Sequence, residues 1–331
     1  MEPKVAVIIP VYNMERYLRE CLDSLVGQTF KDIEIICFND ASTDSSIDIL
    51  REYAARDERF VIIDSPVNIK QGGGRNAGIR AARAPYIMFV DPDDWVEPDF
   101  VEKYYTKAVE TGADIVTGDY NTVTDGNIFH SCGLGHNLPD DSSIIKRSRL
   151  ERDVPIWINI YKRTLFFDNN LFFPENIQLG EDNAIACALF LASTKLRKID
   201  CHLYNYRIHD KSSSHEYNPE RFHQRYITAI LARDNMIRIS GHQYQKEINH
   251  LFLRYYYLQA ILGALDGYAH VLYKEIRFAN ETVLDYVNQV ELNNYISLLS
   301  KGLQFTIKIC RISPALGSLF FRCLKIRANF I

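Results

Sequence analysis

The chain has 331 residues, of which 47% are hydrophobic, so it is long enough to bury a full core and to carry an additional region. Its net charge of −4 and pI near 6.2 exclude a strongly basic surface, and we expect no nucleic-acid partner. The seven cysteines are odd in number and lack metal-site spacing, which favours a reducing compartment. No apolar run reaches the length of about 18 residues that a membrane span needs, and an acidic residue stands second, so we expect neither a span nor a signal peptide.

The first part of the chain, to about residue 120, alternates strand and helix patterns. Continuous apolar runs, typical of strands buried on both faces of a parallel sheet, lie at 5–11, 33–38, 60–64 and 86–91. Helices are predicted over 14–28 with Asn13 as the cap, after the turn at 39–46, and after a glycine-rich loop at 71–78. Ligands of such an open sheet bind outside the carboxyl ends of the strands. We therefore expect Tyr12, Asp40, the glycine-rich loop and the acids after the fourth strand to line one crevice.

Three carboxylates, Asp91, Asp93 and Asp94, follow the fourth predicted strand. Their concentrated negative charge is most simply offset by a divalent cation that also holds an anionic ligand such as a diphosphate. A solvated turn is the alternative, because Asp is common where a strand ends. Asp94 has two possible roles: it could support the other two carboxylates from behind without binding the cation itself, or it could cap a helix that begins near Glu97.

The glycine-rich segment also suggests a dinucleotide phosphate cradle. That fingerprint requires its glycines directly after the first strand and an acid about 20 residues later, whereas here the glycines follow the third strand in the spacing GGGRNAG. The segment is therefore interpreted as exposed amides followed by Arg75, a permanent cation whose planar donor fork suits base edges and phosphates. A surface ion pair is the alternative for Arg75.

Five motifs occur in order: IIPVYN at 8–13, NDASTDSS at 39–46, GGRNAG at 73–78, DPDD at 91–94 and GED at 180–182. With these motifs the sequence, over roughly residues 4–210, resembles the inverting glycosyltransferases of family 2, of the bacterial surface-polysaccharide type. The resemblance implies the α/β GT-A fold, a Rossmann-like, mostly parallel central sheet flanked by helices. It implies transfer of a sugar from a nucleotide-sugar, with UDP favoured, to a hydroxyl of a glycan or lipid-linked acceptor. It does not indicate which sugar is transferred.

The resemblance also implies a set of donor-binding residues. They are Pro10, Tyr12, Asn13, Asp40, Gly73, Arg75, Asp91 and Arg207. Tyr12 would stack on the base, with a packed core tyrosine as the alternative. Asp40 would accept the hydrogen of uracil N3, although the family often has an acid before it, where this chain has Asn39. Arg207 would neutralise phosphate.

A hard divalent cation, Mg²⁺ or Mn²⁺, is implied as the cofactor. In the resembling enzymes the acid at Asp93 coordinates the metal that bridges the two phosphates, and Asp91 binds the ribose or helps to order the metal's water. His209 stands where many relatives supply a metal-binding histidine, which would favour Mn²⁺. An ordinary exposed loop histidine is the alternative.

Glu181 and Asp182 are predicted at the start of a helix, where the dipole stabilises negative charge and favours the ionised form that a base needs. Acids are common in first helical turns for stability alone. The resemblance makes Asp182 the catalytic base that deprotonates the acceptor hydroxyl. Glu181 is then its neighbour and binds an acceptor hydroxyl.

We predict two domains. Residues 1–215 form a nucleotide-sugar-dependent catalytic domain, with a donor-binding half at 1–120 and an acceptor-side half at 121–215, and residues 216–331 form a helical region. A Ser-rich stretch at 210–215 is expected to be a loop that closes over the donor. Residues 133–143 are interpreted either as a mobile acceptor loop or as a disordered insertion.

The tail at 303–331 mixes basic and bulky apolar residues, which is typical of a helix at an anionic membrane surface. A homodimer contact or a helix packed on the body of the protein is the alternative. Because nucleotide-sugars are cytoplasmic, we expect a cytoplasmic enzyme, peripheral on the inner membrane if the tail binds lipid. A catalytically inactive nucleotide-sugar-binding or scaffold protein is the alternative function, and a missing base or metal ligand would favour it, but Asp93 and Asp182 are both present.

Overall fold

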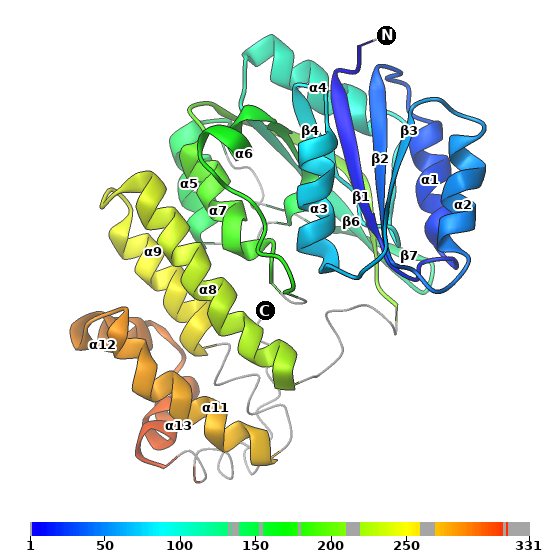
Figure 1. The fold of residues 1–331 in the computed structure, drawn as a ribbon. Helices are drawn as coiled ribbons and strands as arrows, with labels where there is room; N and C mark the ends of the chain where they lie inside the picture. Colours follow the sequence, from blue (N-terminus) through cyan, green and yellow to red (C-terminus); the bar gives the residue numbers. More distant parts are fainter. Residues whose placement is uncertain are drawn as a thin grey trace. The chain divides into compact units, whose positions relative to one another are not determined.

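The computed structural model describes residues 2–131, 133, 139–151, 155–177, 180–209, 219–258, 269–313 and 316 (Figure 1). The chain divides into two compact units, residues 1–215 (unit 1) and 216–331 (unit 2). The Ser-rich stretch expected to close over the donor lies outside the described residues, as do residues 134–138 of the expected acceptor loop.

The described part of unit 1 is built on a nine-stranded sheet with the order β3-β2-β1-β4-β8-β6-β9-β5, and β7 pairs with β6. The strands are β1 (Val5–Val11), β2 (Ile33–Asp40), β3 (Phe60–Ser65), β4 (Tyr86–Phe89), β5 (Trp95–Val96), β6 (Ile115–Thr124), β7 (Asn127–Ser131), β8 (Asn159–Lys162) and β9 (Leu196–Arg207). β1 to β4 are mutually parallel, as expected, whereas β8 runs antiparallel between β4 and β6. The carboxyl ends of β1, β2 and β4 therefore meet at one edge.

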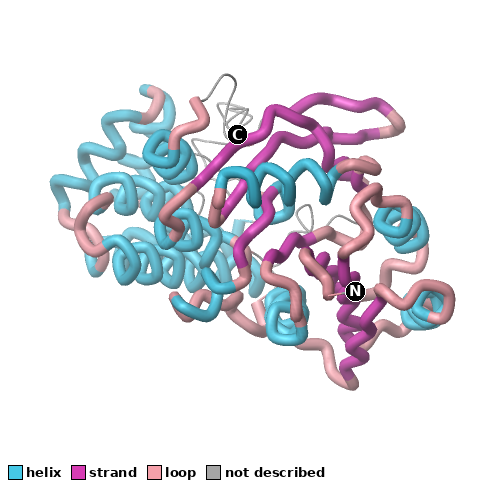
Figure 2. Tube along the Cα trace, turned by 90° about the horizontal axis from the view of Figure 1, so that it is seen from above, coloured by secondary structure: helices cyan, strands magenta, loops and turns pink. Residues whose placement is uncertain are grey.

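Helices flank this sheet on both faces (Figure 2). They are α1 (Leu18–Val26), α2 (Ser46–Ala54), α3 (Lys70–Ala81), α4 (Phe100–Thr111), α5 (Ser142–Glu151), α6 (Thr164–Asp168) and α7 (Asn183–Ala192), with a 3-10 turn η1 (Ile156–Ile158) before β8. The predicted cap of the first helix is wrong. Asn13 has a positive φ of 54° and its Oδ1 accepts a hydrogen bond from the Thr43 backbone at 2.7 Å, so it joins two loops, and α1 starts only at Leu18.

The glycine-rich segment is helical and buried, which corrects the prediction of an exposed loop. A Cβ at Gly78 would lie 2.4 Å from Cγ2 of Ile8, and one at Gly72 would lie 2.4 Å from the carbonyl oxygen of Pro174. Side chains at these positions would push α3 away from β1 and from the segment after α6. Glycine normally weakens a helix, so here close packing overrides local propensity.

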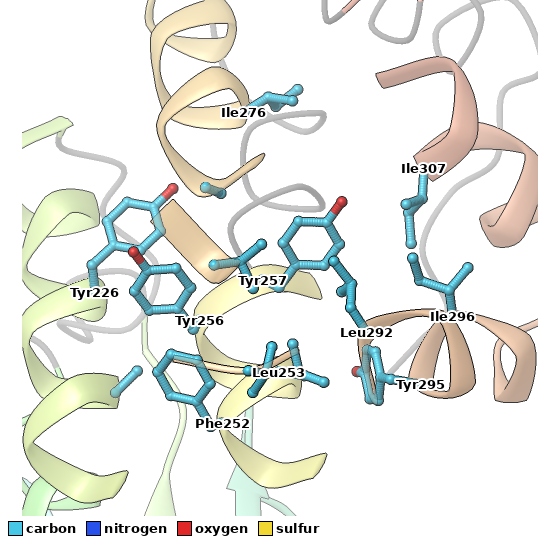
Figure 3. Close-up of a cluster of buried hydrophobic side chains, with 14 of the residues drawn as sticks. Tyr226, Phe252, Leu253, Tyr256, Tyr257, Ile276, Leu292, Tyr295, Ile296 and Ile307 are labelled. Carbon is cyan, nitrogen blue, oxygen red and sulfur yellow. The ribbon is translucent and has the colours of Figure 1, made fainter. Parts of the chain in front are cut away.

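Unit 2 is helical in its described residues, as expected. Its elements are α8 (Pro219–Ser240), α9 (Gln245–Phe252), the π-helical η3 (Leu253–Leu258), α11 (Ala269–Thr282), η4 (Val283–Asp285), α12 (Gln289–Leu298) and α13 (Lys301–Ile312). Their core is rich in tyrosine (Figure 3). The buried Tyr256 and Tyr257 place their hydroxyls on Thr282 and Asn280 of α11, at 2.5 and 2.8 Å. Each ring is thus buried while its polar end is satisfied.

α13 contains the first described part of the predicted membrane tail. Leu303, Ile307 and Cys310 are buried, and α13 packs against α11 and α12 of its own unit. Residues 301–312 therefore form a helix that packs on protein, which was the alternative to a membrane helix. The tail beyond 316 lies outside the described residues. No helix among the residues that the structure describes is long and apolar enough to cross a membrane.

We expect Gly78→Ala to destabilise the fold, because the new methyl group must displace Ile8 from a filled core. Overpacking of this kind costs about 1–3 kcal/mol. Urea unfolding measures the loss. Gly27→Ala is the matched control, because its φ of −73° suits alanine and its Cβ would meet nothing nearer than a carbonyl oxygen at 3.3 Å. Equal unfolding midpoints for the two variants would contradict the close-packing role of Gly78.

Candidate active site

Three strand ends deliver polar side chains to the same edge of the sheet. Tyr12 directly follows β1, Asp40 ends β2, and Asp91 lies just beyond β4. Tyr12 is 45% exposed, which excludes the alternative of a packed core tyrosine. Asp40 is buried, and its Oδ1 accepts a hydrogen bond from the Ile69 backbone at 2.6 Å. Burial raises the pKa of the Asp40 carboxyl above its ordinary value, although the backbone donors that precede α3 oppose this shift.

Two residues expected in the donor site have packing roles. Pro10 lies within β1 in register with Phe38 of β2, and Gly73 lies within α3, where a Cβ would meet the Ile69 side chain at 2.8 Å. Pro10 is thus part of the sheet, and Gly73 packs against the residue that precedes its own helix. Gly73 does not present a loop amide, because it is part of the helix.

Arg75 is the central cation of the site. Its Nη2 donates to Asp91 Oδ1 at 2.9 Å and its Nη1 donates to Glu181 Oε1 at 2.7 Å, with only 3% of the side chain exposed. The alternative of a surface ion pair is therefore wrong. Burial raises the pKa of the Asp91 and Glu181 carboxyls, and the Arg75 guanidinium opposes both shifts. One side chain thus joins a carboxylate that follows β4 to a carboxylate that precedes α7.

Asp94 is a structural anchor and not a helix cap. Its Oδ2 accepts from the Tyr204 hydroxyl at 2.7 Å and its Oδ1 accepts from the Arg207 backbone at 2.8 Å, while α4 begins only after Asp99. The Tyr204 hydroxyl also accepts a hydrogen bond from the Asp91 backbone at 3.0 Å. Burial raises the pKa of Asp94 well above its ordinary value. These bonds tie β9 to the turn that carries the three carboxylates.

Asp93 and His209 face each other at the end of β9. Their Oδ2 and Nε2 atoms are 3.0 Å apart, and the His209 ring stacks on Tyr17 with a centroid distance of 4.6 Å. The Arg207 side chain donates to the Asp93 carbonyl oxygen at 2.9 Å and to Glu20 at 2.5 Å. The structure therefore brings Arg207 into the site but pairs it with a carboxylate of α1.

The donor set at this position, one carboxylate and one imidazole, suits Mn²⁺ better than Mg²⁺. Within the described residues, no three His, Cys, Asp or Glu side chains are grouped closely enough to hold a metal ion alone. Asp93 and His209 supply one carboxylate oxygen and one imidazole nitrogen side by side. A cation such as Mg²⁺ or Mn²⁺ commonly takes one or two protein ligands and fills its other positions with water and phosphate oxygens. The third expected ligand, Asp91, has one oxygen bonded to Arg75.

The expected base stands at the start of α7. Asp182 is the N-cap residue, and its Oδ1 accepts from the Asn183 backbone at 2.8 Å. Burial alone would lower the pKa of Arg75, but the carboxylates of Asp91, Glu181 and Asp182 raise it. Asp182 therefore lies within electrostatic reach of the central cation, next to the buried Glu181. The helix dipole at this position stabilises its negative charge.

Comparisons with known proteins identify the family of this chain. The profile of Glycosyl transferase family 2 matches residues 6–151. Glycosyltransferase GlyA of Streptococcus pneumoniae serotype 4 (strain ATCC BAA-334 / TIGR4) is 34% identical over 259 residues, which are 75% of this chain but only 36% of GlyA. EpsH of Bacillus subtilis strain 168 is 33% identical over 263 residues, which are 75% of this chain and 73% of EpsH. The chain belongs to glycosyltransferase family 2.

A solved structure shows the fold of this glycosyltransferase. Residues 1–349 of S. aureus TarS in complex with UDP superpose with a TM-score of 0.73 at 18% identity, covering 97% of this chain and 92% of that chain. The likeness confirms the GT-A fold expected from the five motifs.

Several residues of the glycosyltransferase's site escaped sequence reasoning. Tyr17 stacks on His209, Trp95 lies 4.5 Å from the Arg207 guanidinium carbon, and Tyr204 binds the Asp94 turn. None of them belongs to a motif. A weak signal was available for Trp95, because it directly follows the third carboxylate and is one of only two tryptophans in the chain.

We expect Arg75→Lys to destabilise the protein, because one ammonium group cannot reproduce the planar fork that holds two carboxylates. The loss of one charge-assisted hydrogen bond in a buried place costs about 1.5–3 kcal/mol. The control is Arg51→Lys, whose partner Asp64 lies at 3.2 Å on the surface, and whose effect should stay below about 1 kcal/mol. Denaturant unfolding of both variants checks this difference, and equal losses would show that the Arg75 bridge adds nothing.

Proposed function

We propose that this glycosyltransferase is metal-dependent and inverting, and that it transfers a sugar from a UDP-sugar to a hydroxyl of a glycan or lipid-linked acceptor in surface-polysaccharide synthesis. The main support is the Arg75 bridge between Asp91 and Glu181, because it holds the expected donor carboxylates beside the expected base. The cytoplasmic supply of nucleotide-sugars supports a cytoplasmic site of action.

The donor would lie across the carboxyl ends of β1, β2 and β4. The exposed ring of Tyr12 offers a face for the uracil. The Ile69 backbone fixes the orientation of the Asp40 carboxylate through one oxygen, and we assign the other oxygen to the N3–H of uracil. Asp93 and His209 would hold the cation beside the diphosphate, where it stabilises the charge of the leaving group when bound.

Asp182 would accept the proton of the acceptor hydroxyl, whose oxygen attacks the sugar carbon from the face opposite the diphosphate. The positive end of the α7 dipole favours the ionised form of this carboxylate. The ion pair with Arg75 holds Glu181 next to Asp182. A hydrogen bond from an acceptor hydroxyl to Glu181 would compete with this ion pair. This arrangement supports a base on the acceptor side of the Arg75 bridge.

We expect the purified chain to bind UDP in the presence of Mn²⁺, to lose most of this binding with excess chelator, and to bind GDP, CDP and TDP more weakly. Asp93→Ala should weaken UDP binding in Mn²⁺ by tenfold or more, since a charged ligand of the cation is lost; a factor of ten corresponds to about 1.4 kcal/mol. Asp99→Ala, which removes an exposed carboxylate nearby, should leave affinity unchanged. Calorimetric titration measures these affinities, and chelator-insensitive binding would refute the metal dependence.

Asp182→Asn should lower the transfer rate by about 10²–10⁴-fold, the range of general base catalysis, with UDP affinity preserved. Asparagine is also a good N-cap residue, so α7 should keep its start and its stability. Asp57→Asn is the matched control, because Asp57 also accepts a backbone hydrogen bond, from Arg59 at 3.0 Å, but lies before the amino end of β3, at the opposite end of the sheet. Release of UDP from UDP-sugar with an acceptor extract measures turnover. A wild-type chain that binds UDP without turnover would favour the inactive binding protein.

A further inference from the structure

We infer that one face of β9, β6 and β7 is the binding site for sugar rings of the acceptor, with Tyr206 and Phe129 as its stacking surfaces. This inference rests on the proposed function, which requires a glycan acceptor beside the donor site. The three strands place Tyr206, Thr122 and Phe129 directly opposite one another, and these three residues form a cross-strand row.

The cross-strand row lies on a partly open sheet face. Tyr206 and Thr122 are half-buried, and Phe129 is 58% exposed. Neighbouring strands are spaced at about 4.8 Å, so the row spans about 10 Å from Tyr206 to Phe129. Thr122 Oγ1 and Ser131 Oγ lie 3.0 Å apart on the same face, so hydroxyl groups stand between the rings.

The row continues from the candidate active site. Tyr204 lies two residues before Tyr206 on the same strand face, and its hydroxyl binds the turn of Asp91 and Asp94. At the other end, the Ile208 backbone donates to Val123 of β6 at 2.9 Å, and the next residue, His209, contacts Asp93. Tyr206, at one end of the row, therefore lies between the two places where β9 touches the donor-side turn, and Thr122 and Phe129 extend the row away from that turn.

Trp157 of η1 holds the Tyr206 ring and the neighbouring rings of Tyr204 and Tyr120 in place. Its ring stacks on Tyr204 at 4.1 Å and on Tyr206 at 5.5 Å, and Tyr120 of β6 meets it edge-on at 5.0 Å. A ring that is already fixed loses little side-chain entropy when a ligand stacks on it. Flat aromatic faces interspersed with hydroxyl groups match the alternating C–H and O–H groups of a sugar ring.

The test uses the full chain with UDP and Mn²⁺, and a panel of short oligosaccharides of glucose, galactose, N-acetylglucosamine and rhamnose as probes. Saturation-transfer NMR detects binding and gives the dissociation constant. Phe129→Ala should raise the constant for the bound oligosaccharide about threefold to tenfold, the equivalent of one aromatic stacking contact. Tyr206→Leu, which keeps apolar bulk under Trp157, should have a similar effect.

Ile128→Ala is the matched control. Ile128 is 57% exposed and neighbours Phe129 on β7, but its side chain points to the opposite face of the strand. Its substitution should leave the dissociation constant unchanged. Equal weakening by the Ile128 and Phe129 variants, or none by the Phe129 variant, would overturn the inference, and so would a wild-type chain that binds no member of the panel.

Two further measurements separate the alternatives. The UDP titration decides the proposed donor site by itself, so a chain that binds UDP but no oligosaccharide retains the proposed function and loses the acceptor site. Sedimentation of the same variants tests whether the strand β7 mediates dimerisation. A wild-type dimer that both β7 substitutions dissociate would make β7 a subunit contact and overturn the inference.

Discussion

The site depends on one buried cation that lies between two carboxylates. Removing three charges from water is costly, and the arrangement is stable only because Arg75 uses separate nitrogens of its planar group for Asp91 and Glu181. The two partners come from segments far apart in the chain, one shortly after β4 and one shortly before α7. The two ion pairs of Arg75 therefore fix the distance between the turn after β4 and the segment before α7.

Close packing of α3 makes this bridge possible. Arg75 reaches both acids only if its helix lies against β1 and against the backbone after α6, and the glycines of α3 remove the side chains that would prevent this approach. The glycines and the arginine of the motif therefore act together. The glycines allow α3 to pack closely, and this position of the helix lets Arg75 reach both carboxylates. Local propensity opposes a helix over such a sequence, so the contacts of α3 with the sheet must supply the stability.

Features that arise from periodicity and strand order are well predicted by the sequence, whereas features that depend on packing between distant segments are not. The strand ends at Tyr12, Asp40 and Asp91 converge as expected, because buried parallel strands have a plain apolar pattern. The helix over 70–81 could not be predicted, because it depends on packing against distant segments. For Asp94 the sequence left two positions open, behind the other carboxylates or at a helix cap, and only its bonds to Tyr204 and Arg207, which are distant in the chain, decide for the first. The sequence also did not predict that β6 pairs antiparallel with β8 and parallel with β9, because polar residues interrupt the apolar pattern of these strands.

β9 links the two sides of the site through the alternation of its side chains. Tyr204 and Tyr206 point to one face and pack with Trp157, while Arg207 donates from its backbone to the Asp94 carboxylate and from its side chain to the Asp93 carbonyl oxygen. A slip of one residue in the pairing of β9 with β6 would exchange these faces, and would remove the tyrosine hydroxyl from Asp94 and the rings from Trp157 together. The register of a single strand thus sets both the shape of the carboxylate turn and the aromatic face that continues from it.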